Sequence, residues 1–190
     1  MLQGKKRMRK KTYEKHCRRI RKTGVKIRHV SSISLGNCNN HSSAPTAGEY
    51  CRFTKSIQLD ESLLYYQKFA FLLHEEGHYK CHAKGCHCFV SLGIANRAKQ
   101  EQHAWEYALQ ELLRTKCSPS LFYTMAQMVA TFNHSDNYID SYYKKAARAI
   151  MRKNIWKECR KAVGGKLWKL LKRYDNHLNA WKKMRKIEKK

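Results

Sequence analysis

An apolar stripe that leads directly into two histidines constrains the fold of this chain more than any other feature. Asp60 stands where a helix N-cap is expected, and Glu61 falls in the first turn. The pattern predicts a helix over about 61–80 that carries His74 and His78 on a core-facing element. The stripe recurs every three or four residues, as one buried face of a helix requires, at Leu63, Leu64, Phe69, Leu72 and Leu73.

One strand and four further helices are predicted around this helix. Residues 50–59 have an approximate period of two, with Phe53, Ile57 and Leu59 on the inner face of a half-buried strand. Gly85 interrupts the helical pattern between 81 and 95, as does Gly93. Helical spacing then resumes over about 96–115, over 121–132, from a cap at Ser135 or Asp136 to about Val163, and over 167–187.

The chain is strongly basic, with 40 Lys and Arg against 14 Asp and Glu and a formal charge of +26 in 190 residues. We expect residues 1–30 to form a basic arm that is at best partly helical. Residues 31–49, rich in Ser, Asn and Gly, are expected to form a linker or loop, and 146–190 a basic helical extension. Such an excess of positive charge favours binding to nucleic acid, to an anionic membrane or to an acidic partner protein.

The composition of the first thirty residues and the number of cysteines indicate the cellular compartment. No apolar stretch of the kind found in secretory signals occurs in those residues. The longest apolar run, 69–73, is far shorter than the roughly 20 residues that cross a bilayer. Eight cysteines without an export signal are more typical of thiols or metal ligands than of a disulfide framework. We therefore expect a soluble protein of the bacterial or host-cell cytoplasm, without a membrane partner.

The segment His74-Glu-Glu-Gly-His78 has the residue types of a zinc site. Because the histidines are four residues apart, both imidazoles project from one helix face and can hold one zinc ion. Glu75 would point beside the metal, where a carboxylate can accept a proton from zinc-bound water. The H-E-x-x-H pattern is that of metalloproteases, but it also arises by chance on solvated helices. The apolar residues 69–73 favour a buried helix here.

A catalytic zinc needs a third protein ligand while one position stays open for water. We expect Glu101 to be that ligand. It lies on the predicted 96–115 helix, in which Ala104 and Ala108 would permit a close approach to the motif helix. Glu106, Glu111 and His103 are competing candidates on the same helix. They cannot all point to one metal ion, because side chains project from a helix in different directions.

The order of these motifs resembles that of the ImmA/IrrE metallopeptidases, which are zinc endopeptidases of bacteria, mobile elements and phages. The resemblance covers about residues 50–145, and His82 matches a histidine of the family's extended motif. A later segment, from Ala130 to Ile139, is similar to the helical segment that follows the peptidase core. The matching residues are Ile57-x-Leu59-Asp60, Phe69 five residues before His74, then H-E-E-G-H-Y-K-C-H, and E-x-x-A-x-x-Y-A-x-x-E-L-L from Glu101.

The resemblance implies an α+β fold, with a mostly helical, zincin-like metallopeptidase domain over 50–145 and a small β-sheet, flanked by the basic arm and the basic helical extension. It implies His74, His78 and Glu101 as zinc ligands and Glu75 as general base. Understood members of the family cleave repressors of the helix-turn-helix class, so it also implies a transcriptional repressor as protein substrate. The strand near 52–59 could be an edge with which an extended substrate pairs.

Two positions depart from the family's pattern. Glu76 replaces the apolar residue that is usual between Glu and Gly, and we expect it to add charge beside the metal. Trp105 replaces a usual Asn or Asp, which bears on the placement of Glu101.

A second cluster of ligand-type residues follows the motif. Cys81, Cys86 and Cys88, interleaved with two histidines, could bind a second, structural zinc. A fourth ligand, such as Cys51, would have to come from elsewhere. The spacing lacks paired C-x-x-C knuckles, so buried or surface thiols are the alternative.

The basic ends offer possible contacts with DNA or RNA, although a solvated face is the commoner meaning of a charge run. The N-terminal candidates are Lys5, Lys6, Arg7, Arg9, Lys10 and Lys11.

Three functions are compatible with these patterns. The first is a zinc-dependent endopeptidase that cleaves a DNA-binding regulatory protein. The second is a basic nucleic-acid-binding protein with a structural zinc or a non-proteolytic peptidase-like fold. The third is a membrane-surface protein that uses the last helix.

Overall fold

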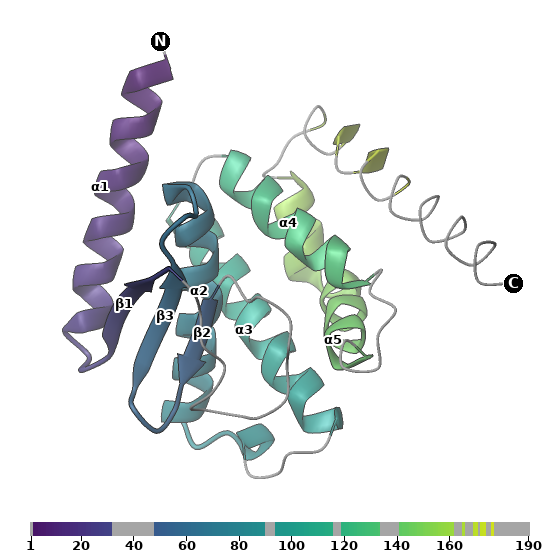
Figure 1. Cartoon of the computed structure of the whole chain (residues 1–190). Helices are drawn as coiled ribbons and strands as arrows, with labels where there is room; N and C mark the ends of the chain where they lie inside the picture. The colour runs from purple at the N-terminus through teal and green to yellow at the C-terminus, as the bar shows by residue number, and fades with distance from the viewer. Residues whose placement is uncertain are drawn as a thin grey trace, which may run out of the picture. The chain divides into compact units, whose positions relative to one another are not determined.

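The computed structural model describes residues 2–31, 48–89, 94–115, 119–133 and 141–161, together with 165, 169, 170, 172, 173 and 176. The chain divides into two compact units, unit 1 (Met1–Cys86) and unit 2 (His87–Lys190). Unit 1 contains two helices and a small sheet, and the described elements of unit 2 are all helical (Figure 1). The predicted α+β class, mostly helical with a small sheet, is confirmed.

The basic N-terminal segment is a continuous helix, α1 (Leu2–Arg21), and not a partly helical arm. Tyr13, Cys17 and Ile20 are buried at helical spacing and attach α1 to the rest of unit 1. Three apolar positions are easily overlooked in a run of charges, which is why the sequence pattern understates this helix. After α1, Gly24 adopts a positive φ of 82° and leads the chain towards the first strand.

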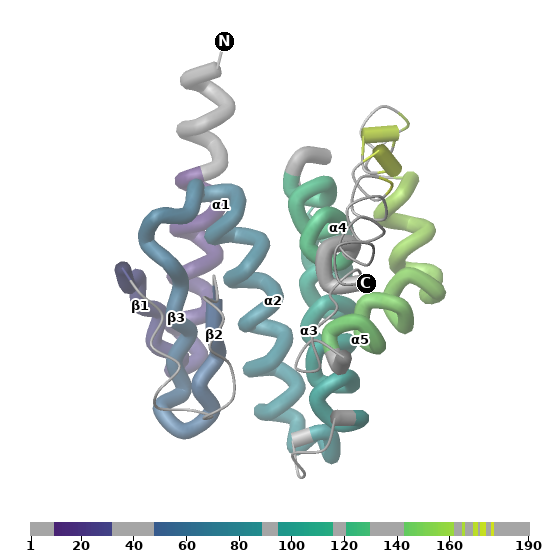
Figure 2. Tube along the Cα trace, turned by 45° about the vertical axis from the view of Figure 1, so that its right-hand side comes forward, coloured from purple at the N-terminus to yellow at the C-terminus, as the bar shows by residue number. Residues whose placement is uncertain are grey.

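The sheet has three strands in the order β1-β3-β2 (Figure 2). In the centre lies β3 (Ser56–Asp60), parallel to β1 (Lys26–Val30) and antiparallel to β2 (Gly48–Cys51). The single strand predicted over 50–59 is wrong, because residues 52–55 form a turn between β2 and β3. Phe53 in this turn is 68% exposed, whereas Ile57 and Leu59 are fully buried as predicted.

The motif lies on α2 (Tyr65–Ala83), which begins four residues later than predicted. Asp60 ends β3 and accepts a hydrogen bond from the backbone N–H of Ser62 at 2.8 Å, so it is not the N-cap. Leu64 is the N-cap, and its N–H donates to the Gln67 side chain at 3.0 Å. The expected burial of Phe69, Leu72 and Leu73 is confirmed. Within unit 1, α2 contacts α1, β2 and β3.

Unit 2 begins with a 3-10 turn, η1 (His87–Phe89), and continues with α3 (Ile94–Arg114), α4 (Pro119–Asn133) and α5 (Ser141–Arg152). The break after Ala83 and the helix over 96–115 are confirmed. Residues 154–161 are also helical, so the predicted fourth helix is interrupted at Lys153. The loop over 32–47, the cap at Ser135 or Asp136 and nearly all of the 167–187 helix lie outside the described residues. The core of unit 2 includes Ala104, Trp105, Ala108, Leu112, Met125, Val129 and Ile150.

Candidate functional site

His74 and His78 face each other on α2. Their Nε2 atoms are 3.2 Å apart, and the rings meet at right angles with centroids 4.7 Å apart. Two nitrogens that each lie about 2.0–2.1 Å from a tetrahedral zinc ion are separated by roughly 3.3 Å. His74 is buried and His78 is half-buried. The pair therefore has the separation, the chemistry and the partial access of two ligands of one metal ion.

Glu75 is buried beside the edge strand β2. Only 5% of its surface is exposed, and a Cβ added to Gly48 would lie 3.4 Å from its Cγ. The neighbouring Glu49 also lies on β2, and its pKa is raised, first by burial and then by the negative charge of Glu75. Both β2 and β3 contact α2, but β2 is an edge strand of the described sheet, whereas β3, which contains the second half of the strand predicted near 52–59, is central.

Glu76 points to α1 and is held there by two basic side chains. Its Oε2 lies 2.7 Å from Nε2 of His16 and 3.0 Å from a terminal nitrogen of Arg19. Glu76 is 3% exposed and His16 is 8% exposed, so this contact is part of the core of unit 1. The expectation that Glu76 adds charge beside the metal is wrong, because the carboxylate is satisfied by α1.

Glu101 lies on α3 and is buried. Together with His74 and His78 it forms a group that could hold a metal ion. The competing carboxylates have other partners, since Glu106 pairs with Lys153 and Glu111 pairs with Arg114. Trp105 is buried in the core of unit 2. Two imidazoles and one carboxylate are a donor set that zinc accepts while keeping a position for water.

A second group that could hold a metal ion consists of Cys81, Cys86, Cys88 and His103. It contains all three cysteines that the sequence indicated, none of which is disulfide-bonded. Cys51, the suggested fourth ligand, is instead disulfide-bonded. This differs from the expectation that the cysteines are free thiols or metal ligands. The fourth member is His103, which the sequence analysis considered only as a rival of Glu101. His103 lies 15 residues after Cys88 in the sequence, so the spacing of the cysteine cluster gives no signal for it.

His82 is engaged within unit 1. Its Nδ1 lies 3.1 Å from the hydroxyl of Tyr50 on β2, and the Tyr50 ring also meets Tyr79 edge-on. The pKa of Tyr50 is raised by burial and by Tyr79. These contacts fasten the end of α2 to the same strand that borders Glu75.

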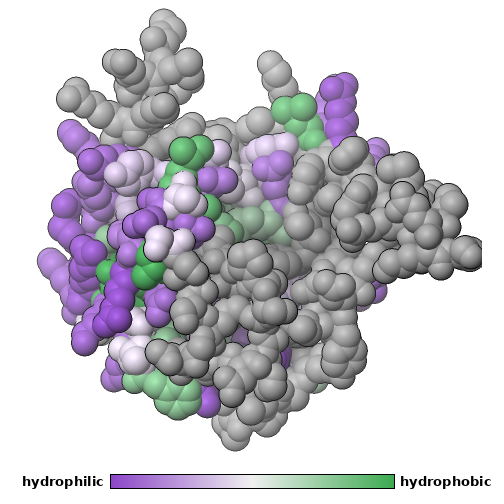
Figure 3. Space-filling model, in the orientation of Figure 1, coloured by the Kyte–Doolittle hydropathy of each residue, from purple (hydrophilic) through white to green (hydrophobic). Residues whose placement is uncertain are grey.

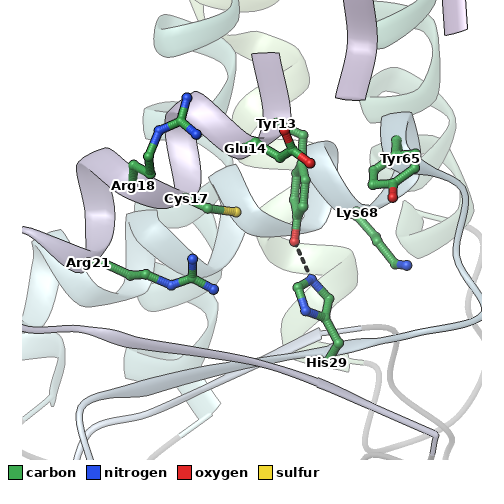
Figure 4. A pocket seen from close by; sticks show the side chains of 8 residues that line it. All are labelled: Tyr13, Glu14, Cys17, Arg18, Arg21, His29, Tyr65 and Lys68. Atoms are coloured by element: carbon green, nitrogen blue, oxygen red, sulfur yellow. Dashed lines mark hydrogen bonds between the residues drawn. The ribbon is translucent and has the colours of Figure 1, made fainter. Parts of the chain in front are cut away.

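A basic pocket of about 660 Å³ lies between α1, β1 and the start of α2. Figure 4 shows His29 between the side chains of Arg21 and Lys68, with the Tyr13 hydroxyl 2.6 Å from its Nε2. Burial lowers the pKa of His29, as do the charges of Lys68 and Arg21. The pKa of Tyr13, the partner of His29 in this hydrogen bond, is raised mainly by burial. Sequence patterns do not predict this pocket, because its residues come from three elements that are separate in the chain.

The predicted nucleic-acid contacts fall on α1. Lys5, Lys6, Arg7 and Arg9 lie on this helix, and the side chains of Lys10 and Lys11 are exposed. In Figure 3 hydrophilic side chains gather on the side where Figure 1 shows α1 and β1. Among the side chains of α1 that the structure describes, the lysines and arginines from Lys10 onward are exposed, whereas His16 is buried.

No helix among the described residues has both the length and the apolar character needed to cross a bilayer. Comparison of the chain with protein-family models, with curated proteins and with solved structures finds no match.

Proposed function

We propose that this chain is a zinc-dependent endopeptidase, with His74, His78 and Glu101 as zinc ligands and Glu75 as general base. The observation that carries the proposal is the approach of the two Nε2 atoms to 3.2 Å on a helix whose next residue is a buried carboxylate. A His₂Glu donor set is typical of catalytic zinc in peptidases. Zinc bound there would lower the pKa of a water molecule to about 7.

The remaining chemistry belongs to side chains of unit 1. Glu75 would take a proton from the attacking water and later deliver it to the leaving amine. Its burial against Gly48 keeps bulk water away from the carboxylate, which strengthens its interactions. The backbone of β2 is at the edge of the described sheet, and an extended peptide could pair with it next to Glu75.

We infer that the substrate is a DNA-binding regulatory protein of the helix-turn-helix repressor type. Two considerations support this inference. The motif order resembles the ImmA/IrrE metallopeptidases, and a charge of +26 favours residence near DNA, where such a substrate is found.

The test is cleavage of candidate helix-turn-helix repressors by the wild type and by Glu75→Gln, followed by mass spectrometry of the fragments. Glu75→Gln should lower kcat/KM by about 10²–10⁴-fold, because it removes the proton acceptor but keeps the shape of the side chain. Zinc content, measured by elemental analysis, should not change.

Glu111→Gln is the matched control, since Glu111 is paired with Arg114 and belongs to neither metal-binding group. It should cleave like the wild type. Equal cleavage by wild type and Glu75→Gln would disprove the role of Glu75.

A second candidate function is nucleic-acid binding without proteolysis, which the basic pocket and the exposed lysines of α1 favour. In that case the wild type would bind zinc and DNA but cleave none of the repressors, and Glu75→Gln would behave like the wild type in every assay.

A further inference from the structure

The end of α2 brings two cysteines together. The N–H of Cys86 bonds to the carbonyl oxygen of Cys81 at 3.2 Å, and the N–H of Gly85 bonds to that of His82 at 2.9 Å. Gly85 has a positive φ of 64°. These two hydrogen bonds and the left-handed residue define a Schellman motif, which is frequently accompanied by a contact between the side chains at the positions of Cys81 and Cys86. In most proteins both positions are apolar, whereas here both carry thiols.

The other two members of the cluster meet within unit 2. Sγ of Cys88 lies 3.8 Å from Nδ1 of His103. Gln100, one helical turn before His103, donates a hydrogen bond from Nε2 to the carbonyl oxygen of Cys88. Cys88 is 3% exposed. The turn η1 is therefore held on α3 by its backbone and by its cysteine.

One cysteine of each pair is close in sequence to a cysteine of the other. Cys86 and Cys88 are separated by one residue, so their Cα atoms lie at most about 7 Å apart. The ligand atoms of all four residues lie within 4.8 Å of one another. Three thiols and one imidazole are a complete tetrahedral set for zinc, and a set that leaves no open position is structural rather than catalytic. Thiolate ligands also select zinc over magnesium or calcium.

We propose that Cys81, Cys86, Cys88 and His103 bind one structural zinc ion. This site is independent of the proposed function, because it shares no ligand with His74, His78 and Glu101.

Zinc stoichiometry of the purified full chain is the first test, measured by elemental analysis. The wild type should hold two zinc ions per chain. Cys86→Ser/Cys88→Ser should hold one, and so should His74→Ala/His78→Ala. Cys159→Ser is the matched control, since Cys159 is a buried thiol whose pKa is raised to about 12 by burial, and it should still hold two.

These variants also separate the two proposals. Loss of zinc only in the Cys86→Ser/Cys88→Ser protein would support the structural site and contradict the peptidase site. Loss only in the His74→Ala/His78→Ala protein would overturn the structural site and leave the peptidase site standing.

A spectroscopic measurement covers the case in which the cysteine variant does not fold. Zinc X-ray absorption of the His74→Ala/His78→Ala protein should show sulfur neighbours at about 2.3 Å and a nitrogen neighbour at about 2.0–2.1 Å. The cobalt(II)-loaded wild type should show thiolate-to-metal charge-transfer absorption in the near ultraviolet. Coordination by oxygen and nitrogen alone, without that absorption, would overturn the proposal.

Discussion

Glu76 shows how one side chain can connect the most basic helix of this chain to the motif helix. The carboxylate is almost completely buried and contacts His16 and Arg19 of α1. A buried charge without partners is costly, so Glu76 is stable in this position only while α1 is docked. The same contact explains why a charge is acceptable at this buried position of α2.

Glu76→Ala should therefore reduce the stability of the protein. Removal of one partner from a buried ion pair costs about 3–5 kcal/mol, but the half-exposed Arg19 contributes less than a buried partner would, so we expect a loss of about 2 kcal/mol. Urea denaturation followed by circular dichroism measures the change. Arg19→Ala is the control and should cost less than about 1 kcal/mol, because 42% of the Arg19 side chain is exposed. Equal losses in the two variants would contradict the role of the buried contact.

His29 makes stability depend on pH. Its pKa in the folded protein is lowered from 6.5, first by burial and then by the charges of Lys68 and Arg21. As the pH falls below about 6.5, the unfolded chain takes up a proton that the folded ring still refuses. The free energy of unfolding should then decrease, until the folded ring is protonated as well.

The measurement is denaturation at about pH 7.5 and about pH 5.5 for the wild type and for His29→Gln. The variant should lose less stability between the two conditions, because its side chain does not titrate. A larger loss in the variant would show that the sign of the shift is wrong.

Among the elements, β2 is the one that most directly shapes the candidate peptidase site. It is short and lies at the edge of the described sheet, and its first residue is a glycine pressed against α2. A Cβ on Gly48 would lie 3.2 Å from Leu59 and 3.3 Å from Phe71, closer than ordinary contacts. The strand can approach Glu75 only because this position has no side chain.

Gly48→Ala should push β2 away from α2 and lower the free energy of unfolding by about 1–3 kcal/mol. If β2 receives the substrate, kcat/KM for repressor cleavage should also fall, while zinc content stays the same. Gly165→Ala is the control, since nothing lies within 4 Å of a Cβ at Gly165, and it should be neutral or slightly stabilising. Unchanged stability in Gly48→Ala would mean that the close approach is easily relaxed.

For the whole molecule the dominant property is its charge of +26. The described part of this charge includes the exposed face of α1 and the basic pocket with Arg18, Arg21 and Lys68. If these basic residues bind DNA, the release of counterions from the DNA makes the affinity strongly dependent on salt and largely independent of base sequence.

Affinity for duplex DNA should therefore fall about tenfold or more between roughly 50 and 200 mM salt, as measured by fluorescence anisotropy. Replacing Arg18, Arg21 and Lys68 by Gln should reduce the slope of log affinity against log salt. Salt-independent affinity would contradict electrostatic binding to the phosphate backbone.

The amino-acid sequence by itself determined the local features of this protein. The helical spacing of Phe69, Leu72 and Leu73 predicts the buried motif helix, and Gly85 predicts its end. The identities of His74, Glu75 and His78 define the chemistry that the helix can offer. Each of these features depends on residues within one or two helical turns, where spacing alone decides which side chains share a face.

Only the tertiary structure decided which distant residues meet. The partnership of His16 with Glu76, the approach of Gly48 to Glu75 and the pairing of Cys88 with His103 join positions 15 to 60 residues apart. Such contacts depend on the hairpin of β2 and β3, on the docking of α1 and on the position of η1 on α3. They follow from how buried surfaces fit together, and a local pattern of apolar and polar residues does not encode that fit.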